Sequence, residues 1–197
     1  MKFFLMRHVE TTGNAENRFA GVTETEYTPK GQKQFETIVH EKADGIDVDA
    51  IYASPISRAR KIAEKIGEKK GLPVHVEDAL KEMNFGIFEN MHYKEVEKKH
   101  EAAFRSWCDD YLHYKIPDGD NLIEFHQRVA CFVDRIKEQE GSALIVCHGG
   151  PIQSMITHLL GLSIEQRWLF HIPLGGMVEV HYEYGRGTLF ALEKLVK

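Results

Sequence analysis

Two histidines in the chain follow apolar runs that have the composition of buried strands. His8 comes after Lys2–Met6 and Arg7, and His148 comes directly after Ala143–Cys147. Imidazole titrates closer to neutral pH than any other side chain, so it can act as a nucleophile, an acid or a base. If the two runs are parallel strands of one sheet, both imidazoles lie at the edge where ligands bind in open α/β folds.

Cationic and amide side chains accompany these histidines in a pattern suited to an anion. Arg7 precedes His8, and Asn14 follows in the next loop. The run Ala50–Ala53 leads into Ser54-Pro55-Ile56-Ser57-Arg58, which places Arg58 in the first turn of a helix, where free N–H groups favour an anion. Each residue alone could be structural, but together they indicate a phosphate pocket. Its expected ligands are Arg7, Asn14, Arg58, His148 and Gly149, the last because glycine lets the backbone approach a ligand closely.

The elements that would position these residues alternate along the chain. Short apolar runs predict strands at Lys2–Met6, Ala50–Ala53, Val74–Val76 and Ala143–Cys147. Helices are expected from the N-cap Ser54 with Pro55 to Gly71, from the N-cap Asn121 through Ile136, and from Gly149-Gly150-Pro151 to Gly161. This alternation predicts an α/β fold whose sheet is mostly parallel and carries helices on both faces.

Two further segments complete the expected fold. Tyr93–Tyr114 has helical spacing but is polar and aromatic, as a lid over a site would be. Met177–Tyr182 and Thr188–Leu195 predict a C-terminal hairpin. No composition break or repeat divides the chain, so we expect one domain over residues 1–197, with a variable lid around residues 84–120.

The composition narrows the class of protein. The chain has 197 residues, 43% of them hydrophobic, and a formal net charge of −5, which does not favour a nucleic-acid partner. The first apolar run is too short for a signal peptide or membrane span, so we expect a cytoplasmic protein with no membrane partner. The 3 cysteines form no CxxC pair, and the 11 histidines show no tight ligand spacing, so no metal site is expected.

Several short motifs occur in a fixed order along the chain. They are Arg7-His8-Val9-Glu10-Thr11-Thr12-Gly13-Asn14, Asn17-Arg18-Phe19-Ala20-Gly21, Thr28-Pro29-Lys30-Gly31-Gln32, Ser54-Pro55-Ile56-Ser57-Arg58-Ala59, Glu82-Met83-Asn84-Phe85-Gly86, Asp118-Gly119-Asp120-Asn121-Leu122 and Val146-Cys147-His148-Gly149-Gly150. Their residues and order resemble the histidine phosphatase superfamily, the phosphoglycerate mutase-like proteins, over residues 2 to about 162. The resemblance implies the phosphoglycerate mutase-like fold.

The resemblance also implies a two-step phosphoryl transfer through a phosphohistidine. His8 would be the nucleophile, with Arg7, Asn14, Arg58 and a protonated His148 around the phosphoryl oxygens, so that neither a metal nor a cofactor is needed. Glu82 would protonate the leaving group and later activate water. We therefore expect a metal-independent phosphatase of small phosphomonoesters whose partner is a small phosphorylated metabolite. Arg18 and Gly21 are candidate residues for substrate specificity.

The sequence departs from the family pattern at three positions. Val9 replaces the usual glycine after the first histidine, and a β-branched residue disfavours a positive φ, so the floor of the pocket is expected to differ. Asn90 stands where the family often has glycine, and Gln153 where it often has arginine. The last two substitutions are expected to affect substrate preference.

Other functions stay open at this point. A phosphoglycerate mutase is the main alternative, but the 65 residues between Glu82 and His148 are fewer than family mutases use to cover the site, which favours hydrolysis. A phosphohistidine protein phosphatase is a further alternative. An inactive binding or regulatory module is another, because of Val9. The sequence identifies neither the physiological substrate nor the oligomeric state.

Overall fold

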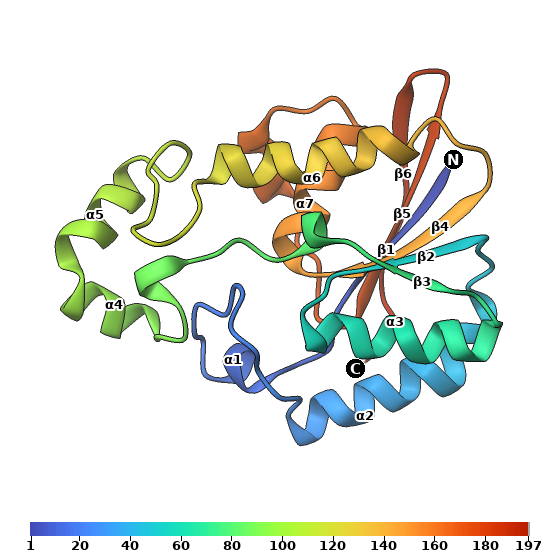
Figure 1. Ribbon diagram of the computed structural model, residues 1–197, viewed down its shortest axis with the longest axis horizontal. Helices are drawn as coiled ribbons and strands as arrows, with labels where there is room; N and C mark the ends of the chain where they lie inside the picture. Colours follow the sequence, from blue (N-terminus) through green and yellow to red (C-terminus); the bar gives the residue numbers. More distant parts are fainter. Residues whose placement is uncertain (197) are drawn as a thin grey trace.

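The computed structural model describes residues 1–196, and its centre is a six-stranded sheet in the order β3-β2-β4-β1-β5-β6 (Figure 1). The strands are β1 (Lys2–Arg7), β2 (Ala50–Ala53), β3 (Val74–Val76), β4 (Ser142–Cys147), β5 (Gly176–Glu183) and β6 (Arg186–Lys194). The first four are parallel, and β5 and β6 extend the sheet as an antiparallel hairpin. The predicted strands, the mostly parallel sheet and the C-terminal hairpin are confirmed.

Helices cover both faces of this sheet, as predicted. They are α1 (Thr12–Ala15), α2 (Pro29–Thr37), α3 (Ser57–Lys70), α4 (Tyr93–Lys99), α5 (Glu101–Asp109), α6 (Leu122–Ile136) and α7 (Gly149–Leu159). A π-helical turn at Ile38–Lys42 continues α2, and 3-10 turns lie at Ala43–Gly45, Asp78–Leu80, Gly86–Phe88 and Ile164–Leu169. In Figure 1, α6 and α7 lie on one face of the sheet, and α2 and α3 lie on the other.

A separate apolar core lies on each face because side chains alternate along a strand. Phe3 and Leu5 of β1 pack in one core with residues of α6 and α7. Met6 of the same strand packs in the other core with residues of α3. The apolar spacing of α6 that predicted a buried stripe is confirmed, since Phe125 and Val129 are buried in the first core. The two cores hold the sheet rigid beneath its carboxyl edge.

The helix boundaries follow their caps, with one exception. Asn121 caps α6 as predicted, since its side chain accepts a hydrogen bond from the Glu124 N–H at 2.7 Å. Gly71 ends α3 with a φ of 66°, the left-handed conformation that glycine favours. The prediction that Ser54 caps α3 is wrong: the helix begins at Ser57, because the Ser54 side chain is hydrogen-bonded within the site described below.

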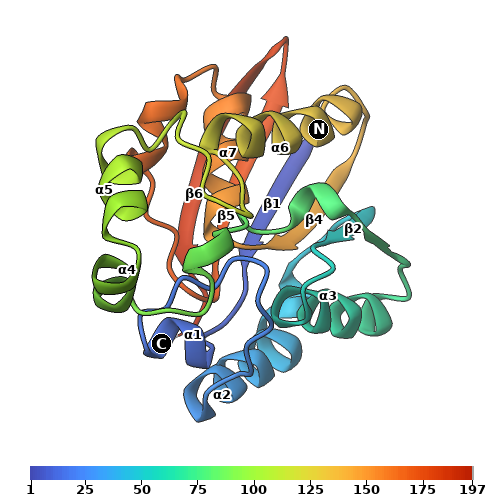
Figure 2. The same cartoon turned by 60° about the vertical axis from the view of Figure 1, so that its left-hand side comes forward.

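The expected lid is helical, but it consists of two helices and ends before Tyr114. The backbone at His100 has a φ of −130° and a ψ of 40°, which separates α4 from α5. Figures 1 and 2 show the pair in green, projecting beyond the edge of the sheet. Phe104 and Trp107 of α5 pack against the first core, which anchors this projecting segment.

Candidate active site

The two predicted histidines lie side by side because their strands pair in register. Arg7 of β1 lies opposite Cys147 of β4, so the residues that follow leave the sheet together. The His8 N–H donates to the Cys147 carbonyl at 3.1 Å, and the His8 and His148 rings lie 5.1 Å apart between centroids. The expectation that both imidazoles meet at one edge of the sheet is confirmed.

The hydrogen bonds of His8 fix where its proton lies. Its Nδ1 is 2.7 Å from the Val9 carbonyl, which can only accept, so Nδ1 carries the proton. Its Nε2 lies 3.3 Å from the Nε–H of Arg58, which can only donate, so Nε2 carries a lone pair. This is the tautomer that an imidazole nucleophile requires.

Both imidazoles are neutral near pH 7. Burial lowers the pKa of His8 well below its usual range, and the positive charges of Arg58 and Arg7 lower it further. Burial likewise lowers the pKa of His148, with Arg58, His8 and Arg7 adding to the effect. A protonated His148 was expected around a phosphoryl group, whereas burial and the neighbouring arginines favour the neutral form in this structure.

Ser54 orients the second histidine. The Nε2 of His148 lies 2.8 Å from the Ser54 Oγ, and both residues are fully buried. The Nδ1 of His148 is also buried, and it has no partner among the described residues. A buried polar nitrogen without a partner is costly, and a phosphoryl oxygen would satisfy it. His148 is also the N-cap of α7, whose free N–H groups favour an anion.

The two predicted arginines are held by backbone carbonyls. Arg58 is 2% exposed and donates to the carbonyls of Thr23 at 2.8 Å, Ala20 at 2.9 Å and Gly21 at 2.6 Å. Arg7 donates through Nη1 to the Ile172 carbonyl at 2.6 Å, while its buried Nε has no partner among residues 1–196. Burial lowers the pKa of both guanidiniums. Two cations therefore lie beside the imidazoles in fixed orientations.

Glu82 joins the site through the first turn of α7. Its carboxylate accepts the Gly150 N–H at 3.0 Å and the Met83 N–H at 3.0 Å. Its negative charge raises the pKa values of Arg7 and Arg58 against the effect of burial, so it lies within electrostatic reach of both. A Cβ on Gly150 would lie 2.1 Å from the Glu82 Oε1, so only glycine allows this contact.

The remaining predicted site residues, which are Asn14, Arg18, Gly149 and Gly21, lie in different parts of the structure. Asn14 and Arg18 line a cavity together with Arg7. Gly149 begins α7, with its α-carbon next to the Arg7 guanidinium. Gly21 lines neither of the cavities described below. Its carbonyl binds Arg58, and its N–H donates to Glu89 at 3.2 Å, so it holds the loop behind the arginine.

The departures from the family pattern are accommodated without distortion. Val9 is fully buried in the second core and is not among the residues with a positive φ, so the expected strain is absent. Asn90 has a φ of 59°, a conformation that asparagine tolerates better than other non-glycine residues. The Gln153 Oε1 accepts the Arg167 Nη2 at 3.3 Å, so a guanidinium from another part of the chain lies beside this position. Sequence reasoning missed Arg167 because only the folded chain brings it here.

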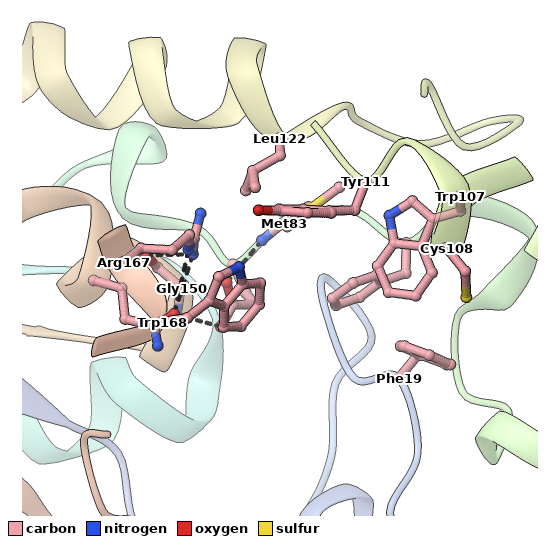
Figure 3. Close-up of a pocket in the computed structure, with 12 residues that line it drawn as sticks. Phe19, Met83, Trp107, Cys108, Tyr111, Leu122, Gly150, Arg167 and Trp168 are labelled. Carbon is pink, nitrogen blue, oxygen red and sulfur yellow. Dashed lines mark hydrogen bonds between the residues drawn. The ribbon is translucent and has the colours of Figure 1, made fainter. Parts of the chain in front are cut away.

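Two cavities open on the site and share Phe19. One has a volume of about 490 Å³ and is called the aromatic cavity here; its lining includes Phe19, Phe85, Trp107, Tyr111 and Trp168 together with Glu82, Gly150 and Arg167 (Figure 3). The other, the basic cavity, has a volume of about 560 Å³, and its lining includes Arg7, Asn14, Arg18, Lys30, His171 and Lys194. Glu82 thus adjoins the aromatic cavity, and Arg7 adjoins the basic one.

Comparison with known sequences identifies the class of protein that this fold and site define. The profile of the family described as "Histidine phosphatase superfamily (branch 1)" matches residues 3–194. The chain therefore belongs to the histidine phosphatase superfamily. The recognition based on sequence motifs is confirmed.

Several relatives are phosphatases by name, and others, 27–30% identical over 164 residues, are named probable phosphoglycerate mutases. Phosphoserine phosphatase 1 of Hydrogenobacter thermophilus is 27% identical over 194 residues, which cover 98% of this chain and 92% of that protein. The adenosylcobalamin/alpha-ribazole phosphatase of Escherichia coli is 29% identical over 177 residues, covering 89% and 87%. The alpha-ribazole phosphatase structure from Shigella flexneri matches with a TM-score of 0.91 at 30% identity, covering 100% of this chain and 98% of that chain. The chain is a phosphoric monoester hydrolase of the histidine phosphatase type.

Within residues 1–196, no group of three or more His, Cys, Asp or Glu side chains is arranged to hold a metal ion. In the same part of the chain, no helix combines the length and the apolar character needed to cross a bilayer.

Proposed function

We propose that the protein hydrolyses small phosphomonoesters, with Nε2 of His8 as the nucleophile and Glu82 as the acid and base. The observation that carries this proposal is the pair of contacts made by the two ring nitrogens of His8. Its Nδ1–H bond to the Val9 carbonyl and its contact with the Nε–H of Arg58 leave a lone pair on Nε2. Neutral imidazole, adjacent guanidiniums and a carboxylate are the groups that phosphoryl transfer through histidine requires.

In the first step, His8 Nε2 attacks phosphorus and the phosphorus–oxygen bond of the ester breaks. Glu82 donates a proton to the departing alkoxide, which leaves as an alcohol. Arg7, Arg58 and the Nδ1 of His148 stabilise the negative charge on the phosphoryl oxygens. In the second step, Glu82 takes a proton from water, the water oxygen attacks phosphorus, and the nitrogen–phosphorus bond breaks to release phosphate. These cationic and hydrogen-bonding groups act in place of a metal ion.

The small size of the segment that covers the site favours hydrolysis over mutase activity. A mutase must keep water away from the phosphohistidine until the group returns to the substrate. In the segment between Glu82 and His148, the part that projects beyond the sheet consists of two short helices, α4 and α5, and α5 has no fully buried residue. We propose that residues 84–120 form a partial lid that admits water after the alcohol leaves.

A panel of phosphorylated metabolites separates the two activities. We expect phosphate release from several small esters, abolished in His8→Ala and unchanged by prolonged EDTA treatment. With 3-phosphoglycerate and catalytic 2,3-bisphosphoglycerate, we expect little 2-phosphoglycerate. Rapid formation of 2-phosphoglycerate without phosphate release would establish the mutase instead, and loss of activity that Mg²⁺ or Zn²⁺ restores would contradict the metal-independent mechanism.

A further inference from the structure

We propose that the preferred substrates are phosphomonoesters whose alcohol carries an aromatic ring, and that the aromatic cavity binds this ring. The inference rests on the proposed role of Glu82. An acid that protonates the leaving oxygen must touch that oxygen, so the rest of the alcohol extends into the space next to it. Glu82 lines the aromatic cavity, which has a volume of about 490 Å³.

The walls of this cavity suit a flat ring. In Figure 3, the indoles of Trp168 and Trp107 lie on opposite sides of the cavity, with Tyr111 above and Phe19 below. Tyr111 and Trp168 already meet in a T-shaped arrangement with centroids 6.1 Å apart. Rings in such positions interact favourably with a further ring inserted between them.

The exposure of Trp168 supports the same conclusion. Its side chain is 63% exposed, although the preceding residue, Arg167, is only 3% exposed. Large apolar groups at the mouth of a pocket commonly mark a binding site. Because Arg167 is anchored to Gly150 and Gln153, the indole next to it is held at the mouth of the cavity.

The size of the cavity argues against a small polar alcohol such as serine, which would leave most of its apolar walls unfilled. The cavity therefore favours an alcohol large and flat enough to contact the aromatic side chains.

Matched substrates test the proposal through turnover. Benzyl, cyclohexylmethyl and ethyl phosphate have alkoxide leaving groups of similar basicity but differ in the group that enters the cavity. We expect kcat/KM for benzyl phosphate to be about tenfold or more higher than kcat/KM for ethyl phosphate or O-phosphoserine. We expect it to be severalfold higher than kcat/KM for cyclohexylmethyl phosphate, which is apolar but not aromatic. Trp168→Ala should lower kcat/KM for benzyl phosphate several times more than that for ethyl phosphate, which removes most of the benzyl preference. Leu169→Ala, an exposed neighbour outside the cavity, should change neither.

Binding tests the proposal independently of turnover. Both tryptophans of the chain, Trp107 and Trp168, line the cavity, so intrinsic fluorescence reports its occupancy. In His8→Ala, benzyl phosphate should change the emission at concentrations about tenfold lower than ethyl phosphate. Equal binding of the two esters, equal turnover of benzyl and cyclohexylmethyl phosphate, or a preference for O-phosphoserine would overturn the proposal. Absence of phosphate release from every ester would instead refute the proposed function, and fluorescence would still decide the ligand class.

Discussion

The backbone N–H of Gly150 donates to the Glu82 carboxylate, and the α-carbon of Gly150 lies so close to that carboxylate that no Cβ fits between them. The first turn of α7 therefore positions the proposed acid. The same turn begins next to His148, so one helix terminus links the imidazole proposed to bind phosphate to the proposed acid.

Gly150→Ala should displace the acid. The added Cβ would lie 2.1 Å from the Glu82 Oε1 and 3.2 Å from the Phe125 ring, so the carboxylate must move. We expect kcat to fall by about tenfold to a hundredfold for alkyl phosphates, less than the roughly 10²–10⁴-fold of a general acid that is lost entirely, because the carboxylate is displaced and not removed. The fall should be much smaller for aryl phosphates. Gly45→Ala is the control, because its Cβ would meet nothing within 4 Å. Unchanged kcat for alkyl phosphates in Gly150→Ala would argue against Glu82 as the acid.

Ser54→Ala should affect catalysis through the orientation of His148. The substitution leaves the buried Nε2 without its partner at 2.8 Å, which costs about 1–3 kcal/mol and frees the ring to turn. We expect kcat/KM to fall by about tenfold, with a weaker affinity for vanadate. Ser57→Ala, at the half-buried start of α3, removes a hydroxyl that donates to Glu24 and not to His148, so it should retain both values. Wild-type vanadate affinity in Ser54→Ala would show that the Ser54 contact is not needed for phosphate binding.

Arg58→Lys should destabilise the protein as well as inactivate it. An ammonium group cannot reproduce the bonds from two guanidinium nitrogens to the carbonyls of residues 20, 21 and 23. We expect the free energy of unfolding, measured in urea, to fall by about 2 kcal/mol or more. Arg60→Lys changes an exposed arginine paired with Glu64 and should alter stability by less than about 0.5 kcal/mol. Equal effects of the two substitutions would refute the structural role of Arg58.

The two buried histidines should make the protein less stable below pH 6.5. Their pKa values are lowered in the folded state, so in this range the unfolded chain binds protons that the folded chain does not. Above pH 6.5 the two histidines are neutral in both the folded and the unfolded chain, so they no longer change stability with pH. Below pH 6.5 each histidine lowers the free energy of unfolding by about 1.4 kcal/mol per pH unit, until the pH reaches its lowered pKa in the folded state. Urea unfolding between pH 7.5 and 5 should show a shallower decline in His148→Gln than in the wild type. An identical decline would contradict the neutral assignment of His148.

Strand-end histidines and arginines could be predicted from the sequence because their positions depend on local patterns. A short apolar run before His8 and another before His148 were enough to place both at one edge of a parallel sheet. The N-cap of α6 was also local, since Asn121 binds a backbone N–H three residues away.

Features that depend on distant contacts were not predictable in the same way. Ser54 has the sequence context of an N-cap, but its hydroxyl binds His148, which is 94 residues away. Arg167 reaches the site only because the turn at Ile164–Leu169 packs on α7. The concern about Val9 was wrong because the role of this position is fulfilled by its carbonyl, which any residue with an ordinary φ can present to His8.

The most direct test of the mechanism is the site of covalent phosphate. Enzyme mixed with a ³²P-labelled phosphomonoester, quenched in alkali and digested should yield one labelled peptide, with the phosphate on Nε2 of His8. The label should be stable in base and lost in mild acid, and it should be absent from His8→Ala. A phosphate found on another residue, or wild-type turnover in His8→Ala, would contradict the account.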